Sequence, residues 1–299
     1  MGYLDNFRAS EHGQNDLDNC HKDEQGVTNF VTKFHLKLIR ILLLIINQNL
    51  STFITIGLLM RKNKKNALII FINAPRFGEV KTRLQPELTV EQSLLLYRAM
   101  VEDLMRQLDG IAFCDVKIFF TPLDADNEIK KWLGPNYEFY IQKGNDFGEI
   151  MKEAMAEIFK QGYQKVVMIG SDIPTIDTTT IVRAFSNLDG YDVVLGPSTD
   201  GGYYLVGIKK TQPKLFNDII WSTNTVFEQT IQKTRKLKLE VVQIEIKSNI
   251  NIYNDVVELW NYLKKRNVQG KSNYKSETYK VLKNIFVHEN SVEFQSAYH

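Results

Sequence analysis

The sequence is poor in the residues from which many active sites are built. Its 299 residues include two cysteines, Cys20 and Cys114, and their separation matches no metal-binding spacing. Cys114 falls in an apolar run and is expected to be a small buried hydrophobic residue. The five histidines lie in predicted tails or beside an apolar leader, so no Ser–His–Asp arrangement stands out. This cysteine usage is compatible with a reducing cytoplasm, where we expect the protein to work.

The sequence also lacks a strong net charge and the common nucleotide-binding signatures. There are 37 basic and 35 acidic residues, so the formal net charge is +2, which gives no support for nucleic-acid binding. No Gly-x-x-x-x-Gly-Lys-Ser/Thr motif is present, and no Gly-x-Gly-x-x-Gly follows the first predicted strand. A P-loop ATPase and a dinucleotide-dependent oxidoreductase are therefore disfavoured. The composition, 43% hydrophobic and 24% charged, is ordinary for a soluble globular protein.

Residues 1–60 form a leader that differs from the rest of the chain. The first 33 residues or so are polar and without periodicity, and the segment Ile41–Met60 has about the length of a membrane span. Polar residues from Asn47 to Thr52 sit at its centre, and basic residues flank both ends, which argues against a simple span. A membrane anchor, a helix packed on the domain and a leader without function, with Met60 as the true start, all remain open.

From Ala67 onward, apolar runs alternate with amphipathic stretches. Strands are predicted over Ala67–Ile72, Val116–Thr121, Tyr137–Ile141, Lys165–Ile169, Asp192–Gly196, Tyr203–Ile208 and Leu239–Ile246. Helices are predicted over Thr89–Leu108, Asp124–Leu133, Phe147–Gln161, Asp177–Asn187, Asn224–Lys236 and Asn254–Lys265. This alternation predicts an α/β, Rossmann-like domain with a mainly parallel sheet and helices on both faces. Residues 267–299 are expected to be a polar tail with one weak helix around Tyr279–Val287.

The loop Asn73–Leu84, which follows the first apolar run, carries a Lys and an Arg two residues apart. Gly78 lets the backbone bend or approach a ligand closely. Lys81 supplies a point charge, and Arg83 supplies a planar fork that suits phosphate oxygens. We interpret the segment as a phosphate-holding loop at the carboxyl end of the first strand, although this segment alone leaves a solvated basic loop open.

A second loop, Gly170–Pro174, directly follows the apolar run Lys165–Ile169. Asp172 is thereby presented at the end of a buried strand, the usual placement for a Mg²⁺ or Mn²⁺ ligand that faces phosphates. Capping of the next helix is a weaker explanation for Asp172, because Asp177 or the residue after it can serve as that cap.

The third loop, Gly196–Tyr204, adds another carboxylate at the same edge of the sheet. Asp200-Gly201-Gly202 between two apolar runs is a strong signal for a hairpin turn. The two glycines also leave room for the ring or ribose of a ligand against the backbone. A turn and a ligand contact are compatible with each other here.

These ordered motifs resemble the DUF2064 family, bacterial proteins often described as glycosyltransferases within the nucleotide-diphospho-sugar transferase (GT-A-like) superfamily. The resemblance covers about residues 66–264 and includes Gly144-x-Asp146-Phe147-Gly148 and Trp221-Ser222-Thr223. It implies a GT-A-like domain over residues 66–266, with Lys81 and Arg83 on phosphates and Asp172 on the metal. The nucleotide site that it implies comprises Ala74, Pro75, Gly78, Lys81, Arg83, Gly144 and Asp172. The substrate site that it implies comprises Asp200, Gly201, Gly202, Tyr203 and Trp221.

The chain departs from the family pattern at two places. Ile150 stands where a basic residue commonly follows Gly-Glu, and Asn249-Ile250-Asn251 stands where relatives tend to have Asp-x-Asp. An asparagine at 251 keeps a carbonyl oxygen that can ligate Mg²⁺ but removes a charge, so we expect Asn251 as a second, weaker metal ligand.

Three functions fit these residues. The first is metal-dependent glycosyl transfer from a nucleotide-sugar, as the family description implies. The second is transfer of a nucleotidyl group from a nucleoside triphosphate to a phosphorylated small acceptor, which the Lys/Arg loop slightly favours. The third, motivated by Asn249 and Asn251, is nucleotide binding without turnover. Base, sugar, acceptor and oligomeric state are not encoded in any motif of the sequence.

Overall fold

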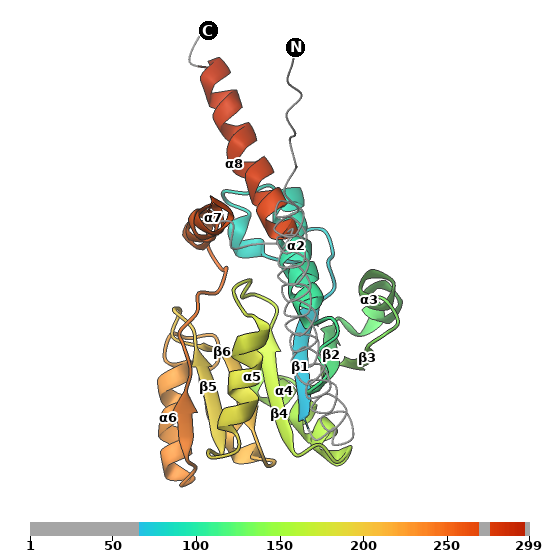
Figure 1. The fold of residues 1–299 in the computed structure, drawn as a ribbon, viewed down its shortest axis with the longest axis vertical. Coiled ribbons are helices and arrows are strands. Elements are labelled where there is room, and N and C mark those ends of the chain that lie inside the picture. Colours follow the sequence, from blue (N-terminus) through green and yellow to red (C-terminus); the bar gives the residue numbers. More distant parts are fainter. Residues whose placement is uncertain (1–65, 269–275, 297–299) are drawn as a thin grey trace, which may run out of the picture. The chain divides into compact units, whose positions relative to one another are not determined.

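The structure is a computed structural model that describes residues 66–268 and 276–296, and its centre is one mixed sheet (Figure 1). The strands are β1 Asn66–Asn73, β2 Asp115–Thr121, β3 Glu138–Ile141, β4 Lys165–Gly170, β5 Val193–Pro197, β6 Tyr203–Ile208 and β7 Val241–Gln243. Their order in the sheet is β3-β2-β1-β4-β6-β5-β7. Strand β6 runs antiparallel to β4 and β5, whereas the other neighbouring pairs are parallel. The prediction of a mainly parallel sheet is confirmed.

Helices cover both faces of this sheet. They are α2 Val90–Leu108, α3 Asp126–Leu133, α4 Phe147–Lys160, α5 Thr178–Asn187, α6 Val226–Lys236, α7 Tyr253–Val268 and α8 Glu277–Ser296, with short 3₁₀ turns η1 Thr82–Leu84, η2 Leu123–Ala125 and η3 Pro213–Phe216. Alternate residues of β1 enter two separate cores, because successive side chains of a strand point to opposite faces. One core packs β1 against α2, α5, α7 and α8, and the other packs it against α4, η3 and α6.

Helix starts follow the predicted capping chemistry. Thr89 and Gln92 form a reciprocal capping box at the start of α2. Asp177 caps α5 by accepting the backbone N–H of Thr180, and Asp146 caps α4 in the same way. Because Asp177 fills the capping role, Asp172 is left for another purpose, as expected.

The C-terminal segment differs from the predicted polar tail. Helix α8 is longer than the weak helix expected around residues 279–287, and its Leu282 and Ile285 are buried in the core. Asp103 of α2 accepts the backbone N–H groups of Glu277 and Thr278, so a carboxylate from a distant helix caps α8. Ser276 also caps α8 locally by accepting the backbone N–H of Tyr279, whereas the contribution of Asp103, 174 residues away from Glu277, could not be predicted from the local sequence.

Two further predictions concern Cys114 and the N-terminal leader. Cys114 is buried, as predicted from its apolar neighbours. The predicted leader, residues 1–60, lies outside the described part of the chain. Among the helices that the structure describes, none combines the length and apolarity that crossing a membrane requires.

Candidate functional site

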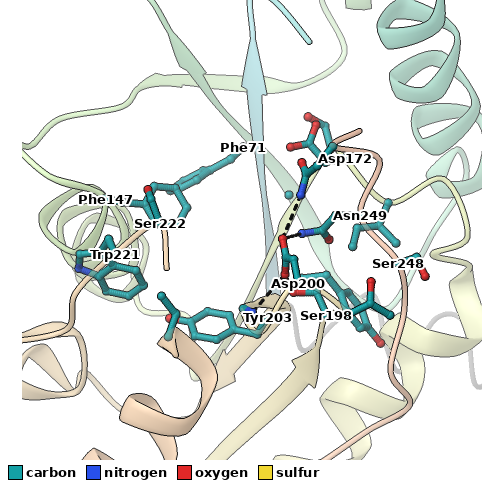
Figure 2. Close-up of a pocket in the computed structure, with 18 of the residues that line it drawn as sticks. Phe71, Phe147, Asp172, Ser198, Asp200, Tyr203, Trp221, Ser222, Ser248 and Asn249 are labelled. Carbon is teal, nitrogen blue, oxygen red and sulfur yellow. Dashed lines mark hydrogen bonds between the residues drawn. The ribbon is translucent and has the colours of Figure 1, made fainter. Parts of the chain in front are cut away.

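A cavity of about 920 Å³ opens at the carboxyl ends of β1 and β4, on the face of the sheet that α4 covers. Figure 2 shows that its labelled side chains divide into two groups. We call the first group the polar side, which comprises Arg83, Asp172, Ser198, Asp200, Ser248, Asn249 and Asn251. We call the second the aromatic side, which comprises Phe71, Phe147, Met151, Met168, Tyr203 and Trp221.

Lys81 is already paired on the polar side. Its Nζ lies 2.7 Å from Oδ1 of Asp172 and donates to the backbone carbonyl of Ile250 at 2.6 Å. The Lys81 side chain is only 7% exposed, and its backbone is left-handed, with φ of 51°. A non-glycine residue adopts that conformation only when its surroundings enforce it. Lys81 does not line the cavity, and its charge is paired with Asp172. Its role as a direct phosphate ligand stays a prediction.

Arg83 is placed differently from Lys81. It is exposed, lines the cavity, and has no acidic partner among residues 66–268 and 276–296. Its guanidinium is therefore available for an anionic ligand. The other residues expected at the nucleotide site are not among those that line the cavity; they are Ala74, Pro75, Gly78 and Gly144.

Asp200 is the centre of a hydrogen-bond network on the polar side (Figure 2). Its Oδ1 accepts from the Ser198 hydroxyl at 2.6 Å and from the backbone N–H of Gly202 at 3.1 Å. Its Oδ2 accepts from the side-chain amides of Asn249 at 2.6 Å and Asn251 at 3.0 Å. The two asparagines thus direct their NH₂ groups at a carboxylate.

The network sets the charge of Asp200. Burial raises the pKa of this carboxyl, but hydrogen bonds from four donors outweigh burial and hold the pKa below its ordinary range. Asp200 is consequently ionised at neutral pH, and with both oxygens occupied it acts as a structural anion.

The segment that carries Asn249 and Asn251 is fixed at several points. The backbone N–H of Ile250 donates to the carbonyl of Asp172, and the N–H groups of Asn251 and Ile252 donate to Oδ2 of Asp255. Because Lys81 also holds this segment, the loops after β1, β4 and β5 converge on it. These contacts fix the backbone that carries the two asparagines of the polar side.

The aromatic side is built from edge-on ring contacts. The ring centroids of Phe147 and Trp221 are 5.6 Å apart, those of Tyr203 and Trp221 are 6.4 Å apart, and those of Phe71 and Phe147 are 6.0 Å apart. Burial raises the pKa of Tyr203, so its phenol stays neutral. This side of the cavity presents rings and thioethers without a formal charge.

Two glycines allow the Trp221 loop to close on this side. A Cβ at Gly148 would lie 2.5 Å from Nε1 of Trp221, and a Cβ at Gly201 would lie 2.0 Å from the carbonyl oxygen of Asn224. Gly201 also has φ of +83°. The prediction of a turn at Gly201 is confirmed by the antiparallel pairing of β5 and β6, and its glycine additionally permits the close approach of another loop.

The structure brings some predicted site residues together and adds others. Asp172, Asp200, Gly202, Tyr203, Trp221 and Asn251 all line the cavity. Sequence reasoning missed Phe71, Met151 and Met168, because apolar residues in strands and helices read as core. It also missed Gln142, whose Nε2 donates to the carbonyl of Phe119 and leaves its Oε1 open; its position just after a strand was the available signal.

The donor set fits a divalent cation that shares its ligands with phosphate. No cluster of three or more His, Cys, Asp or Glu side chains occurs among the described residues, so they offer no complete protein cage. Asp172 has one carboxylate oxygen beyond the one paired with Lys81, and Asn251 keeps its amide oxygen because its NH₂ group faces Asp200. Mg²⁺ is often held by one or two such groups together with substrate phosphates and waters.

The chain is similar to several known proteins. The DUF2064 family, described as an uncharacterized protein conserved in bacteria, matches residues 104–223. A proposed nucleotide-diphospho-sugar transferase from Desulfovibrio desulfuricans G20 has a crystal structure that is 34% identical, with a TM-score of 0.67, over 74% of this chain and 95% of that one.

Two archaeal relatives carry the name of an activity. The 2-phospho-L-lactate guanylyltransferase of Methanobrevibacter smithii is 25% identical over 220 residues, which are 70% of this chain and 95% of that protein. The protein of the same name from Methanocaldococcus jannaschii is 29% identical over 141 residues, which are 47% of this chain and 59% of that protein.

Proposed function

We propose that this chain, a transferase that belongs to the DUF2064 family of the nucleotide-diphospho-sugar transferase superfamily, moves a nucleotidyl group from a nucleoside triphosphate to a phosphorylated small acceptor. The observation that carries the proposal is the arrangement of Asp172 and Arg83, a carboxylate and a guanidinium without an acidic partner in the described part of the chain, which line one cavity at the ends of neighbouring strands. The names of the archaeal relatives support nucleotidyl transfer over glycosyl transfer.

The charges around the cavity support a metal-dependent reaction. Four carboxylates line it, those of Asp172, Asp200, Asp255 and Glu258, against the single guanidinium of Arg83. A triphosphate would be repelled by this lining unless cations accompanied it. A Mg²⁺ or Mn²⁺ ion held by Asp172 and the amide oxygen of Asn251 would neutralise charge on the phosphates.

The chain's own residues would then act by positioning and by charge. Arg83 would bind the phosphates of the nucleotide through its planar fork, and Lys81 would keep Asp172 oriented toward the cavity. A phosphate oxygen of the acceptor attacks the α-phosphorus, a new P–O bond forms, and the bond to the β-phosphate breaks. Pyrophosphate leaves with the electron pair of that bond, so no protein group needs to become covalently attached.

Glycosyl transfer, which the family description put first, has weaker support: the name of the Desulfovibrio desulfuricans structure refers to nucleotide-diphospho-sugar transfer, whereas both archaeal relatives are named guanylyltransferases. Binding without turnover was suggested by Asn249 and Asn251. Their amides stabilise Asp200, which gives both residues a role that is compatible with catalysis.

The test is to incubate the protein with each of the four nucleoside triphosphates, Mg²⁺ or Mn²⁺, and 2-phospho-L-lactate or another phosphomonoester. We expect acceptor-dependent release of pyrophosphate with at least one triphosphate. Acceptor-dependent release of a nucleoside diphosphate from a nucleotide-sugar, without pyrophosphate from any triphosphate, would instead indicate glycosyl transfer. Nucleotide binding with neither product would indicate the non-catalytic function.

A further inference from the structure

The rings of the aromatic side are partly exposed in the part of the chain that the structure describes: Phe147 is 46% exposed, and Trp221 is half-buried. Trp221 makes edge-on contacts with Phe147 and Tyr203, and all three side chains still line the cavity. Edge-on packing leaves the flat face of a ring free for another group. Exposed rings at a cavity wall are the usual way to bind an apolar part of a ligand.

The position of this surface assigns it to the acceptor rather than to the nucleobase. Gln142, just after β3, offers an amide group on the β3 side of the two strands, β1 and β4, that precede Arg83 and Asp172, and Asn73 offers another at the end of β1. Amides of this kind suit the hydrogen-bonding edge of a base. Tyr203 begins β6, beyond β4 and away from β3, and Trp221 contacts it there, while Phe147 joins the surface from the start of α4.

The charges beside this surface exclude one class of acceptor. Arg83 is the only cation among the described residues that line the cavity, and the phosphates require it. Asp200 and Glu258 are negative, and both oxygens of Asp200 are already occupied. An acceptor that carried a carboxylate in addition to its phosphate would find no second basic side chain among the described residues that line the cavity, and would face these two acids.

We propose that the acceptor is a phosphate monoester of a neutral alcohol with an apolar or ring-shaped body, which packs against Trp221, rather than a phosphorylated carboxylic acid. This deepens the proposed function and rests on it for the reaction. It also sets the chain apart from the archaeal relatives, whose name specifies phospholactate.

The experiment compares phenyl phosphate with 2-phospho-L-lactate as ligands of the full chain. Binding is measured by titration calorimetry with Mg²⁺ and with the α,β-methylene analogue of each nucleoside triphosphate. We expect phenyl phosphate to bind up to about tenfold more tightly, which is the upper end of what one added aromatic contact gives. Tighter binding of phospholactate, equal binding of the two, or no binding of phenyl phosphate would overturn the proposal.

A pair of variants locates the contact. Trp221→Ala should weaken phenyl phosphate binding about tenfold and leave phospholactate binding unchanged. Ile220→Ala is the matched control, because Ile220 is the neighbouring residue, is 67% exposed and does not line the cavity. Equal affinity of the Trp221→Ala variant and the parent would overturn the proposal. If this variant does not fold, Trp221→Leu keeps an apolar side chain without the ring and should show a smaller loss in the same direction.

Pyrophosphate release in the same mixtures separates the two proposals. Release with phospholactate and none with phenyl phosphate would leave nucleotidyl transfer standing and overturn the acceptor class. Phenyl phosphate binding that depends on Trp221, without pyrophosphate from any triphosphate, would support the apolar subsite and overturn nucleotidyl transfer.

Discussion

The two sides of the cavity are stabilised in different ways. On the polar side, Lys81, Asp172 and Asp200 are tied to three loops by ion pairs and hydrogen bonds. On the aromatic side, Trp221 and Phe147 meet by ring contacts and depend on glycines that let the loops approach. A site that handles charge must be preorganised, whereas a site that binds apolar groups needs shape and open surface. The comparison can be tested by changing each side separately.

The largest effect is expected from Asp172→Asn. The change removes the only carboxylate assigned to the metal, so metal-dependent nucleotide binding or turnover should fall on the order of 100-fold or more. Lys81 would also lose its counter-charge, which should lower the free energy of unfolding by about 1–2 kcal/mol, because Asp172 is half exposed and solvent screens the pair. Titration of nucleotide binding with Mn²⁺ checks this result.

Asp189→Asn is the control for this change. Asp189 pairs with Lys165, is largely exposed and lies away from the cavity. The nucleotide binding of the Asp189→Asn variant should depend on Mn²⁺ concentration in the same way as that of the parent protein. If Asp172→Asn does the same, the metal is held elsewhere and the polar side has been misassigned.

Gly201→Ala should disturb the aromatic side through the Trp221 loop. A Cβ there would lie 2.0 Å from the carbonyl oxygen of Asn224, at a backbone φ of +83°. The free energy of unfolding should fall by roughly 2–3 kcal/mol, because the loop must move or the backbone must strain. Chemical denaturation measures the change. Gly190→Ala, where a Cβ meets nothing within 4 Å, should change stability by less than about 0.5 kcal/mol, and equal effects of the two variants would contradict the account.

Two variants should distinguish a residue that contacts the ligand from one that stabilises the site. We expect Arg83→Ala to affect ligand binding and Lys81→Ala to affect stability. Arg83→Ala should weaken nucleotide binding about tenfold and leave the melting temperature unchanged, because its side chain is exposed and unpaired among the described residues. Lys81→Ala should lower the free energy of unfolding by about 1–2 kcal/mol, since it leaves Asp172 and the Ile250 carbonyl without their partner. Calorimetry and thermal melts of both variants check this. Weaker nucleotide binding by Lys81→Ala, together with a loss of stability in Arg83→Ala, would show that Lys81 is the direct ligand.

The smallest effect is expected from Asp200, and it should depend on pH. Hydrogen bonds keep the pKa of Asp200 below its unfolded value, so the stability that they contribute is complete above about pH 4 and is lost as the pH falls through the folded pKa. At pH 7, Asp200→Asn should cost about 0.5–1 kcal/mol, because the side chain is exposed and screened. The difference from the parent should shrink in denaturation curves below pH 4. A difference that stays constant down to pH 2 would argue against an ionised Asp200.

The sequence predicted the fold and much of the polar side, because both follow local rules. Apolar runs marked the strands, and Asp172 and Asp200 could be placed at the sheet edge by their position after those runs. The role of Lys81 could not be predicted, since a loop sequence does not say whether a charge faces a ligand or a neighbouring carboxylate.

Most residues of the aromatic side could not be assigned to the cavity from the sequence. Trp221 was found only through the family resemblance, and Met151 and Met168 follow the same apolar periodicity as core residues. Whether an apolar side chain ends in the core or at a cavity wall depends on which loops approach it, and those contacts are long-range. The capping of α8 by Asp103 could not be predicted either, because it is also a long-range contact.

The central claim is that this cavity transfers a nucleotidyl group, and the fate of the α-phosphorus tests it most directly. The protein is incubated with Mg²⁺, a phosphomonoester acceptor and each nucleoside triphosphate labelled at the α-phosphorus, and the products are separated. The account predicts that the label moves to the acceptor, that one equivalent of unlabelled pyrophosphate appears per labelled product, and that Asp172→Asn abolishes both. Label that stays in the triphosphate with every base and acceptor, while a nucleotide-sugar releases its nucleoside diphosphate, would contradict it.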